Sequence, residues 1–263
     1  MIVSRPLPSV PTSVTIIKDT IGRYFASFVV EVEKPLPLST ERSCGIDLGL
    51  AHFAILSSGE KIDNPRWHKK MLKRIKRAAR KLTKAQRGSK RREKRKRRLA
   101  KLHAKIKQQR QDFHHKLTTR LVRENQALAV EDLNVSGLVK NRKLSRAISD
   151  AGWSSFKAML EAKCDKYGRH LTIVDRWYPS SQLCSECGES GGRKELDVRE
   201  WQCLYCHSVH DRDINASRNL EQYTREAGGQ SDSYNKERGA SVSLPMAAVC
   251  GEPLTTPMQL TLF

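Results

Sequence analysis

Alternating apolar and polar positions near the N-terminus predict a β-hairpin. In residues 13–33, β-branched and aromatic residues alternate with polar ones on both sides of the turn sequence Lys-Asp-Thr-Ile-Gly, a pattern typical of paired strands. The linker EKPLPLSTERS follows, and its two prolines interrupt any ladder of backbone hydrogen bonds. From residue 44, CGIDLGLAHFAILSSGEKID predicts two short strands around a bend at Gly49 and a third strand after the Ser-Ser-Gly turn at 57–59.

Two long helices are predicted between residues 66 and 125. Apolar residues recur there at helical spacing, and the triplet Arg-Gly-Ser at 87–89 separates two such runs. The pattern indicates a helical hairpin with one apolar stripe. The positions that carry it are Leu72, Ile75, Ala79 and Leu82 in the first run, and Leu99, Leu102, Ile106, Phe113, Leu117 and Leu121 in the second.

Short apolar runs and helical patterns alternate in the second half of the chain. ALAVEDLNV at 127–135 predicts a buried strand that ends in a carboxylate pair, and HLTIVDRWYP predicts a further strand. Between them, residues 149–167 predict a helix with Asp150 near its N-cap and Gly168 beyond its end. Another helix should reach about Tyr223. The buried face of the first helix is expected to hold Trp153, Phe156, Leu160 and Cys164.

The charge of the chain is concentrated in one segment. The formal net charge is +21 and the pI near 9.9, and residues 66–110 hold 23 Lys or Arg against the single acid Glu93. A surface this basic predicts a polyanionic partner, with nucleic acid as the first candidate and an anionic membrane surface as the alternative. The chain has neither an apolar run of about 18 residues nor the apolar segment of a signal peptide, so an intracellular protein without a membrane partner is expected.

Four of the seven cysteines form two CxxC pairs. Fifteen residues separate the pair Cys184 and Cys187 from the pair Cys203 and Cys206, a spacing that predicts a structural Zn²⁺ site of the zinc-ribbon type. Four thiolates leave the ion no open position, so no chemistry is assigned to it. His207 and His210 lie close by and are alternative ligands. The other cysteines, Cys44, Cys164 and Cys250, are interpreted as small apolar fillers.

Three acidic residues stand in contexts that suggest a second metal site. Asp47 lies inside a predicted strand, Glu131 lies where the apolar run ALAV ends, and Asp213 stands at the expected N-cap of a helix. Each alone has an ordinary explanation, since aspartates cap helices and a strand-end glutamate can pair with an arginine. Together they resemble a divalent-cation site, because an unpaired carboxylate at a strand centre is costly and a cation offsets that cost.

The chemistry that uses such carboxylates is metal-assisted phosphodiester hydrolysis, in which two Mg²⁺ ions about 3.5–4 Å apart activate water and stabilise the leaving oxygen. The order of predicted elements, with one acid on the first strand of the sheet, one on the fourth and one on a later helix, is that of ribonuclease H. The predicted fold is therefore an α/β mixed sheet with two insertions, the basic helical hairpin and the zinc ribbon.

Five blocks of the sequence resemble the TnpB (OrfB) family encoded by insertion sequences, which is related to type V CRISPR effector nucleases. The resemblance spans about residues 5–220 and implies a RuvC-like nuclease that cuts target DNA under a guide RNA, in the cytoplasm and at the nucleoid of a prokaryote. The blocks are GIDLGL, VEDLNVSGL, SRAISDAGWSSFKAMLEAKCDKYG, VDRWYPSSQLCSECG and VREWQCLYCHSVHDRDINASRNL.

Matched motif by motif, the resemblance implies roles for individual residues. Asp47, Glu131 and Asp213 become the catalytic Mg²⁺ ligands, and the four cysteines become the Zn²⁺ ligands. Asp211 becomes a supporting residue, and Asn215 is expected to steady the helix start or the site. Trp67 and Trp153 are candidates for stacking on a base, with core packing favoured for Trp153.

The resemblance also implies a domain organisation and leaves two functions open. Family members carry an N-terminal helical lobe and most of a β-barrel ahead of these elements, so an N-terminally truncated relative is expected. The first hypothesis is an RNA-guided, Mg²⁺-dependent DNA endonuclease, and the alternative is a catalytically inactive remnant that binds RNA or DNA. The expected parts are a barrel remnant with linker at 1–40, a nuclease core at 41–178 with the basic hairpin at 66–125, the zinc ribbon at 179–209, the last core helix at 210–224 and a mostly disordered tail at 225–263.

Overall fold

The structure is a computed structural model that describes residues 2–3, 6–31, 40–195, 197–228 and 259–262. The chain divides into two compact units. The first contains residues 1–35, 66–117 and 250–263, and the second contains residues 36–65 and 118–249. Most of the expected linker, residues 32–39, lies outside the described residues.

The predicted N-terminal hairpin is present in the first unit. Strands β2 (Ser13–Lys18) and β3 (Tyr24–Val29) pair antiparallel, and Asp19 Oδ1 closes their turn by accepting from the backbone N–H groups of Ile21 and Arg23. The described strands of this unit, which include β1 (Ile2–Val3) and β11 (Gln259–Leu262), lie in the order β1-β11-β3-β2. Strand β11 departs from the expected irregular tail, of which residues 229–258 lie outside the described part.

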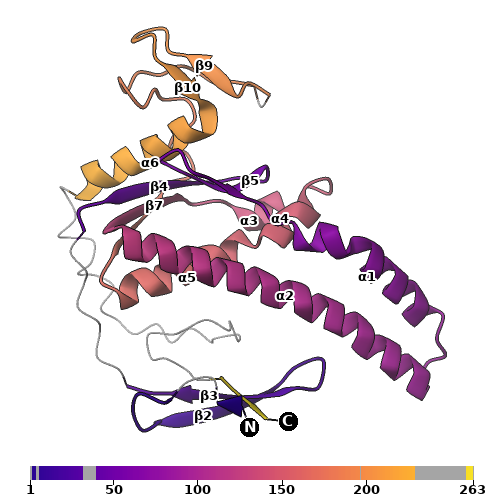
Figure 1. Cartoon of the computed structure of the whole chain (residues 1–263). Helices are drawn as coiled ribbons and strands as arrows, with labels where there is room; N and C mark the ends of the chain where they lie inside the picture. The colour runs from indigo at the N-terminus through magenta and orange to yellow at the C-terminus, as the bar shows by residue number, and fades with distance from the viewer. Residues whose placement is uncertain (1, 4–5, 32–39, 196, 229–258, 263) are drawn as a thin grey trace. The chain divides into compact units, whose positions relative to one another are not determined.

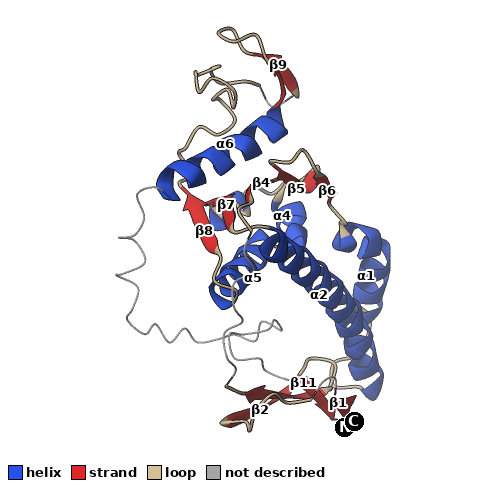
Figure 2. Ribbon diagram, turned by 60° about the vertical axis from the view of Figure 1, so that its left-hand side comes forward, coloured by secondary structure: helices blue, strands red, loops and turns tan. Residues whose placement is uncertain are grey.

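Two helices occupy the basic segment, as the apolar periodicity predicts. Helix α1 (Trp67–Thr83) and helix α2 (Lys90–Glu124) lie side by side in Figures 1 and 2. The Trp67 ring meets the Phe113 ring edge-on, with centroids 5.4 Å apart. At the far end of α1, Arg92 Nη1 on α2 donates to the backbone oxygens of Leu82 and Ala85. The break between the helices coincides with the predicted one at 87–89.

A mixed sheet forms the centre of the second unit. In its described part the strand order is β6-β5-β4-β7-β8. Strand β7 is parallel to both β4 and β8, whereas β5 is antiparallel to β4 and to β6. The strands are β4 (Ser43–Leu48), β5 (His52–Leu56), β6 (Lys61–Asp63), β7 (Ala127–Glu131) and β8 (His170–Val174).

Helices cover both faces of this sheet (Figures 1 and 2). Helix α6 (Arg212–Gly228) crosses one face, and helix α5 (Trp153–Lys166) lies on the other. The Phe156 ring of α5 packs edge-on against Phe53 of β5, with centroids 5.1 Å apart, and Leu220 of α6 is fully buried among Ala129 and Val174. Helix α6 extends to residue 228, five residues beyond the predicted end at Tyr223.

The helix predicted at 149–167 is in fact two helices. Gly152, with φ of 69°, ends α4 (Ser145–Ala151) and precedes α5. Asp150 is therefore not an N-cap, because it lies inside α4, where it is buried. The predicted buried face is confirmed, since Trp153, Phe156, Leu160 and Cys164 are all at most 5% exposed. A short helix, α3 (Val135–Leu138), connects β7 to this region.

The cysteine segment forms a hairpin that leads into α6. Strands β9 (Glu200–Gln202) and β10 (Val209–Asp211) pair antiparallel. Helix α6 begins at Arg212, immediately after β10 ends, as Figure 1 shows. The second CxxC pair and the N-terminus of α6 are therefore separated by only a few residues of ordered chain.

Candidate functional site

The register of two parallel strands places Asp47 beside Glu131. Strands β4 and β7 pair with Ile46 opposite Val130, and the next residue on each strand is one of the two acids. Because parallel strands share their carboxyl edge, both side chains stand at the same level of the same edge. Both residues are partly buried. The sequence-predicted pair is thus brought together by strand pairing.

Asp213, whose Oδ2 lies 3.4 Å from Arg199 Nη1, is the third predicted acid. It lies in the first turn of α6, the helix that packs over β4. Burial, followed by the negative charges of Asp213 and Glu131, raises the pKa of Asp47 to about 7. Burial and the charge of Asp132 raise the pKa of Glu131 as well. Asp47 is therefore the one of the three acids whose pKa is raised by the charges of both others.

Among the described residues, the three carboxylates are not a group whose ligand atoms already lie close enough together to share one ion. Buried acids that repel one another hold a proton in the absence of a counter-charge, and the raised pKa of Asp47 reports that condition. A bound cation would supply the counter-charge and lower the pKa of these carboxyl groups, so that they stay ionised. Oxygen donors from three carboxylates are the ligand type that Mg²⁺ prefers. The chemistry of the donor set suits the magnesium site that the sequence predicts, and the spacing of the three side chains in this structure does not by itself form one.

Asp211, not Asp213, makes the capping contacts at the start of α6. Its Oδ1 accepts from the backbone N–H groups of Asp213 at 3.0 Å and Ile214 at 3.1 Å, and its Oδ2 accepts from Lys61 Nζ of β6 at 2.5 Å. Burial opposes ionisation, but these hydrogen bonds and the Lys61 charge hold the pKa of Asp211 below its usual value. The expectation that Asp213 is the N-cap was wrong because the helix begins two residues earlier.

The acid next to Glu131 makes the ion pairs that a strand-end carboxylate was expected to make. Asp132 Oδ1 accepts from Lys157 Nζ at 2.8 Å, and its Oδ2 pairs with Arg176. Side-chain hydrogen bonds from these two cations hold the pKa of Asp132 below its usual value. Glu131 is thus distinguished from its neighbour by a raised pKa instead of a lowered one.

A cavity of about 210 Å³ lies beside Glu131, the one of the three acids that lines it. Glu131 and Leu48 line it on the sheet side, and Trp153 and Lys157 line it on the α5 side. Trp153 is 5% exposed, which agrees with its predicted role in the core. The exposed tryptophan near this edge is Trp177, 84% exposed in the loop after β8, and sequence reasoning passed over it.

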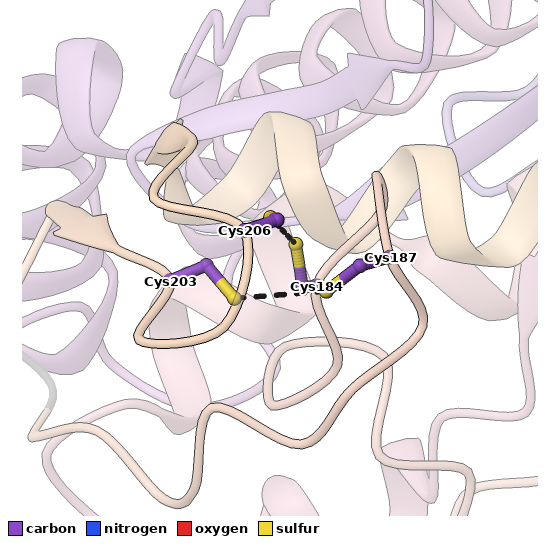
Figure 3. A group of neighbouring side chains, drawn as sticks. All are labelled: Cys184, Cys187, Cys203 and Cys206. Atoms are coloured by element: carbon purple, nitrogen blue, oxygen red, sulfur yellow. Dashed lines mark hydrogen bonds between the residues drawn. The ribbon is translucent and has the colours of Figure 1, made fainter.

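The four cysteines of the two CxxC pairs converge on one point (Figure 3). Their sulfur atoms all lie within 4.8 Å of one another. Cys184 Sγ is 3.5 Å from Cys206 Sγ, and Cys187 Sγ is 3.7 Å from Cys203 Sγ. Tetrahedral Zn²⁺ with Zn–S bonds of about 2.3 Å spaces its sulfurs about 3.8 Å apart, so the arrangement fits such an ion.

The two CxxC turns have matching backbones. Gly188 N donates to Cys184 O and His207 N donates to Cys203 O, and both residues are left-handed, with φ of 77° and 61°. Neither histidine that was considered as an alternative ligand belongs to the close group of ligand atoms in the described residues. His210 instead places Nε2 3.1 Å from Cys184 Sγ.

The other two described cysteines do not belong to the four-cysteine group. Cys44 and Cys164 are buried, as fillers should be, and burial raises the pKa of both thiols, that of Cys164 to about 12. Cys250 lies outside the described residues. Sequence reasoning missed two residues that shape the carboxylate site: Lys61, which holds Asp211, and Gly45, which lets α6 approach β4.

Two family models match the chain. The model described as a probable transposase, OrfB_IS605, matches residues 27–142. The model described as the Cas12f1-like TNB domain matches residues 153–220. These two segments contain all three acids and all four cysteines discussed above. The resemblance to the TnpB (OrfB) family is thereby confirmed.

Curated relatives support the same assignment. A putative RNA-guided DNA endonuclease of Streptomyces pristinaespiralis is 46% identical over 241 residues, which are 90% of this chain and 60% of that protein. The putative RNA-guided DNA endonuclease InsQ of Escherichia coli K12 is 28% identical over 233 residues, 82% of this chain and 58% of that protein. The chain therefore spans about three fifths of the length of these relatives.

A solved structure shares the fold. The cryo-EM structure of a Cas12f1–sgRNA–target DNA complex matches with a TM-score of 0.51 at 17% identity, covering 75% of this chain and 45% of that one.

Within the described residues, no helix is both long and apolar enough to cross a membrane.

Proposed function

This chain is a relative of the TnpB (OrfB) proteins, and from that premise we propose that it is a DNA endonuclease with a RuvC-like, ribonuclease H-type site that acts under an RNA guide. The observation that carries the proposal is the register that sets Asp47 beside Glu131 on two parallel strands, together with the charge of Asp213 on α6, which raises the pKa of Asp47. The strand order β6-β5-β4-β7-β8, with β4, β7 and β8 parallel, is the order of a ribonuclease H sheet.

In this proposal the three carboxylates hold the catalytic cations. These residues would hold Mg²⁺, which would supply activation of a water molecule and stabilisation of the leaving oxygen of the scissile phosphate. Asp47 and Glu131 provide oxygen ligands from the rigid sheet edge, and Asp213 completes the set from α6. Lys61 and Asp211 fix the start of that helix. The neighbouring cavity, lined by Glu131 and Lys157, is open to part of the substrate beside Glu131.

The other parts of the chain have supporting roles in the proposal. The four-cysteine hairpin binds a structural Zn²⁺ ion, since four thiolates leave it no open position. Helices α1 and α2 carry most of the 23 Lys and Arg residues of 66–110 and bind the phosphate backbones of guide RNA and target DNA. Such binding should weaken steeply as salt concentration rises.

The test is cleavage of end-labelled single-stranded DNA and of DNA paired to RNA, with Mg²⁺ or with a chelator. We expect products only with Mg²⁺, and none from the variants Asp47→Asn, Glu131→Gln and Asp213→Asn. The matched control is Asp63→Asn, because that carboxylate lies on β6 with its side chain 96% exposed. Unchanged cleavage by Asp47→Asn would contradict the proposed site.

The same experiment decides between cleavage and simple binding. The chain is a binding protein if three results are found together. It binds RNA or DNA in a salt-dependent manner, the triple acid variant keeps that binding, and no product forms at any Mg²⁺ concentration. The environment of Asp47 argues against that outcome, because a buried carboxylate whose pKa is raised by two further acids is costly unless a cation binds there.

A further inference from the structure

Helix α6 presents a stripe of amide side chains toward the first CxxC turn. Asn215, Asn219 and Gln222 follow one another at spacings of four and three, which places them on one face of the helix. Asn215 and Asn219 are each 1% exposed. Buried amides require partners, and here the partners are backbone groups of residues 180–185.

Asn215 holds the backbone on both sides of Cys184. Its Nδ2 donates to Leu183 O at 2.7 Å, and its Oδ1 accepts from Ser185 N at 2.9 Å. The two contacts fix the peptide groups that flank the cysteine. Through them, the position of one sulfur ligand and the position of the helix depend on each other.

The other two amides extend the same contact. Asn219 Nδ2 donates to Ser180 O at 2.7 Å and to Leu183 O at 2.9 Å, and Gln222 Nε2 donates to Ser185 O at 2.7 Å. The second CxxC pair is attached to the same helix covalently, because β10 runs directly into α6. Both halves of the four-cysteine site are thus anchored to one helix.

The other side of this helix start carries Asp213, the third acid of the proposed site, whose Oδ2 lies 3.4 Å from Arg199 Nη1. Asp213 precedes Asn215 by two residues, which is about 200° around a helix of 3.6 residues per turn. One rigid turn of helix therefore has the cysteine site on one side and the carboxylate group on the other. A displacement of the first CxxC turn moves Asp213 relative to Asp47 and Glu131, which stand on the sheet.

We infer that Asn215 is a positioning residue that couples the two metal sites, so that metal binding by the four cysteines raises the affinity of the carboxylate group for its divalent cation. Without an ion, no bonds through the sulfurs hold the two CxxC turns together, so the first turn can move. Helix α6 then moves with it, because Asn215 is hydrogen-bonded to the backbone on both sides of Cys184. The inference rests on the proposed function, since it requires that the carboxylates bind a cation.

The experiment measures Mn²⁺ binding, not cleavage. The full chain is prepared with Zn²⁺ bound and, separately, with Zn²⁺ stripped under reducing conditions and the chelator removed, and free Mn²⁺ is followed by electron paramagnetic resonance. In the wild type we expect stripping to raise the Mn²⁺ dissociation constant about tenfold, a typical effect of losing an outer support of a metal ligand. In Asn215→Ala we expect a similar rise with Zn²⁺ still bound, and less than about a twofold further change on stripping.

The matched control is Gln202→Ala. Its amide donates to His207 O at 3.0 Å within the cysteine hairpin and forms no part of the α6 stripe, so the dissociation constant should stay within about twofold of the wild type. If Asn215→Ala does not fold, as judged by circular dichroism, Gln222→Ala removes one hydrogen bond of the same contact and should give a smaller rise. Equal Mn²⁺ affinity of the wild type with and without Zn²⁺ overturns the inference.

Failure of the proposed function has a different signature. In that case Asp47→Asn leaves Mn²⁺ binding unchanged, which means that the carboxylates are not the site. Mn²⁺ binding that depends on Asp47 but ignores both Zn²⁺ and Asn215 leaves the function intact and rejects the coupling alone.

Discussion

Gly45 and Ser217 meet backbone to backbone where α6 crosses β4. A Cβ atom on Gly45 would lie 1.9 Å from Ser217 O and 2.7 Å from Glu221 N, so only glycine permits this approach. Gly45 lies two residues before Asp47, and Ser217 lies four residues after Asp213. The contact therefore sets the distance between the strand and the helix that carry these two acids.

The substitution Gly45→Ala should accordingly disturb both packing and the site. We expect the free energy of unfolding in urea to fall by about 2–3 kcal/mol, the range of an overpacked core, and Mn²⁺ binding at the carboxylates to weaken. Gly49→Ala is the control, because a Cβ there would lie 3.1 Å from His52 O and a small shift relieves it. A Gly45→Ala chain as stable as the Gly49→Ala chain would show that α6 is not held in this close contact.

Much of the second unit follows from local pattern, because its strands and helices bury faces of regular period. The runs around Ile46, Val130 and Val174 are apolar enough to identify three strands without tertiary information. Gly152 shows the limit of such patterns. Its left-handed φ of 69° ends α4, and α5 begins at the next residue. The spacing of apolar residues alone predicts one continuous helix across this position.

The grouping of the four cysteines was predictable from the sequence, the acids stay a prediction, and the residues that arrange them gave no signal. Asp47 and Glu131 are recognisable because an acid beside an apolar run is unusual, and the CxxC spacing identifies four ligands. Gly45 and Lys61 gave no such signal, since a glycine in a strand and a lysine on a surface are common. Their importance lies in contacts far away in the sequence, those of Gly45 with α6 and that of Lys61 with Asp211, the residue before α6.

The capping role of Asp211 predicts a stability effect separate from catalysis. Asp211→Ala removes the acceptor of two helix N–H groups and the partner of Lys61, so the free energy of unfolding should fall by about 1–2 kcal/mol. Asp211→Asn keeps the acceptor and should cost less than about 1 kcal/mol, because the lost ion pair is partly exposed. Urea unfolding measures both changes. Should Asp213→Asn destabilise more than Asp211→Ala, the assignment of the cap would be wrong.

Removal of metal from the cysteine site should release four thiols. The measurement is the count of thiols that react with Ellman's reagent at pH 8, in a Cys250→Ser background. Cys44 and Cys164 should stay silent in the folded chain, because burial raises their pKa, that of Cys164 to about 12, and the reactive thiolate is scarce below the pKa. The control Cys164→Ser should leave the count unchanged. Equal reactivity with and without metal would contradict the four-thiolate site.

The matching CxxC turns predict opposite effects of two substitutions. His207 adopts φ of 61°, the conformation that Gly188 adopts at the same place in the first turn. Because glycine has no Cβ penalty there, His207→Gly should stabilise the hairpin by up to about 1 kcal/mol. Gly188→Ala should destabilise it by about 1 kcal/mol through the backbone alone, since the added Cβ meets nothing within 4 Å.

Amide hydrogen exchange of Cys203 and Cys184, whose N–H groups bond to Ser208 O and Glu189 O, reports the opening of each turn. Slower exchange at Cys203 in His207→Gly, and faster exchange at Cys184 in Gly188→Ala, are the expected results. The Zn²⁺ content should stay at one ion per chain in His207→Gly, because His207 does not belong to the group of close ligand atoms. Loss of the ion in that variant would instead make His207 a ligand, and the four-sulfur assignment would then fail.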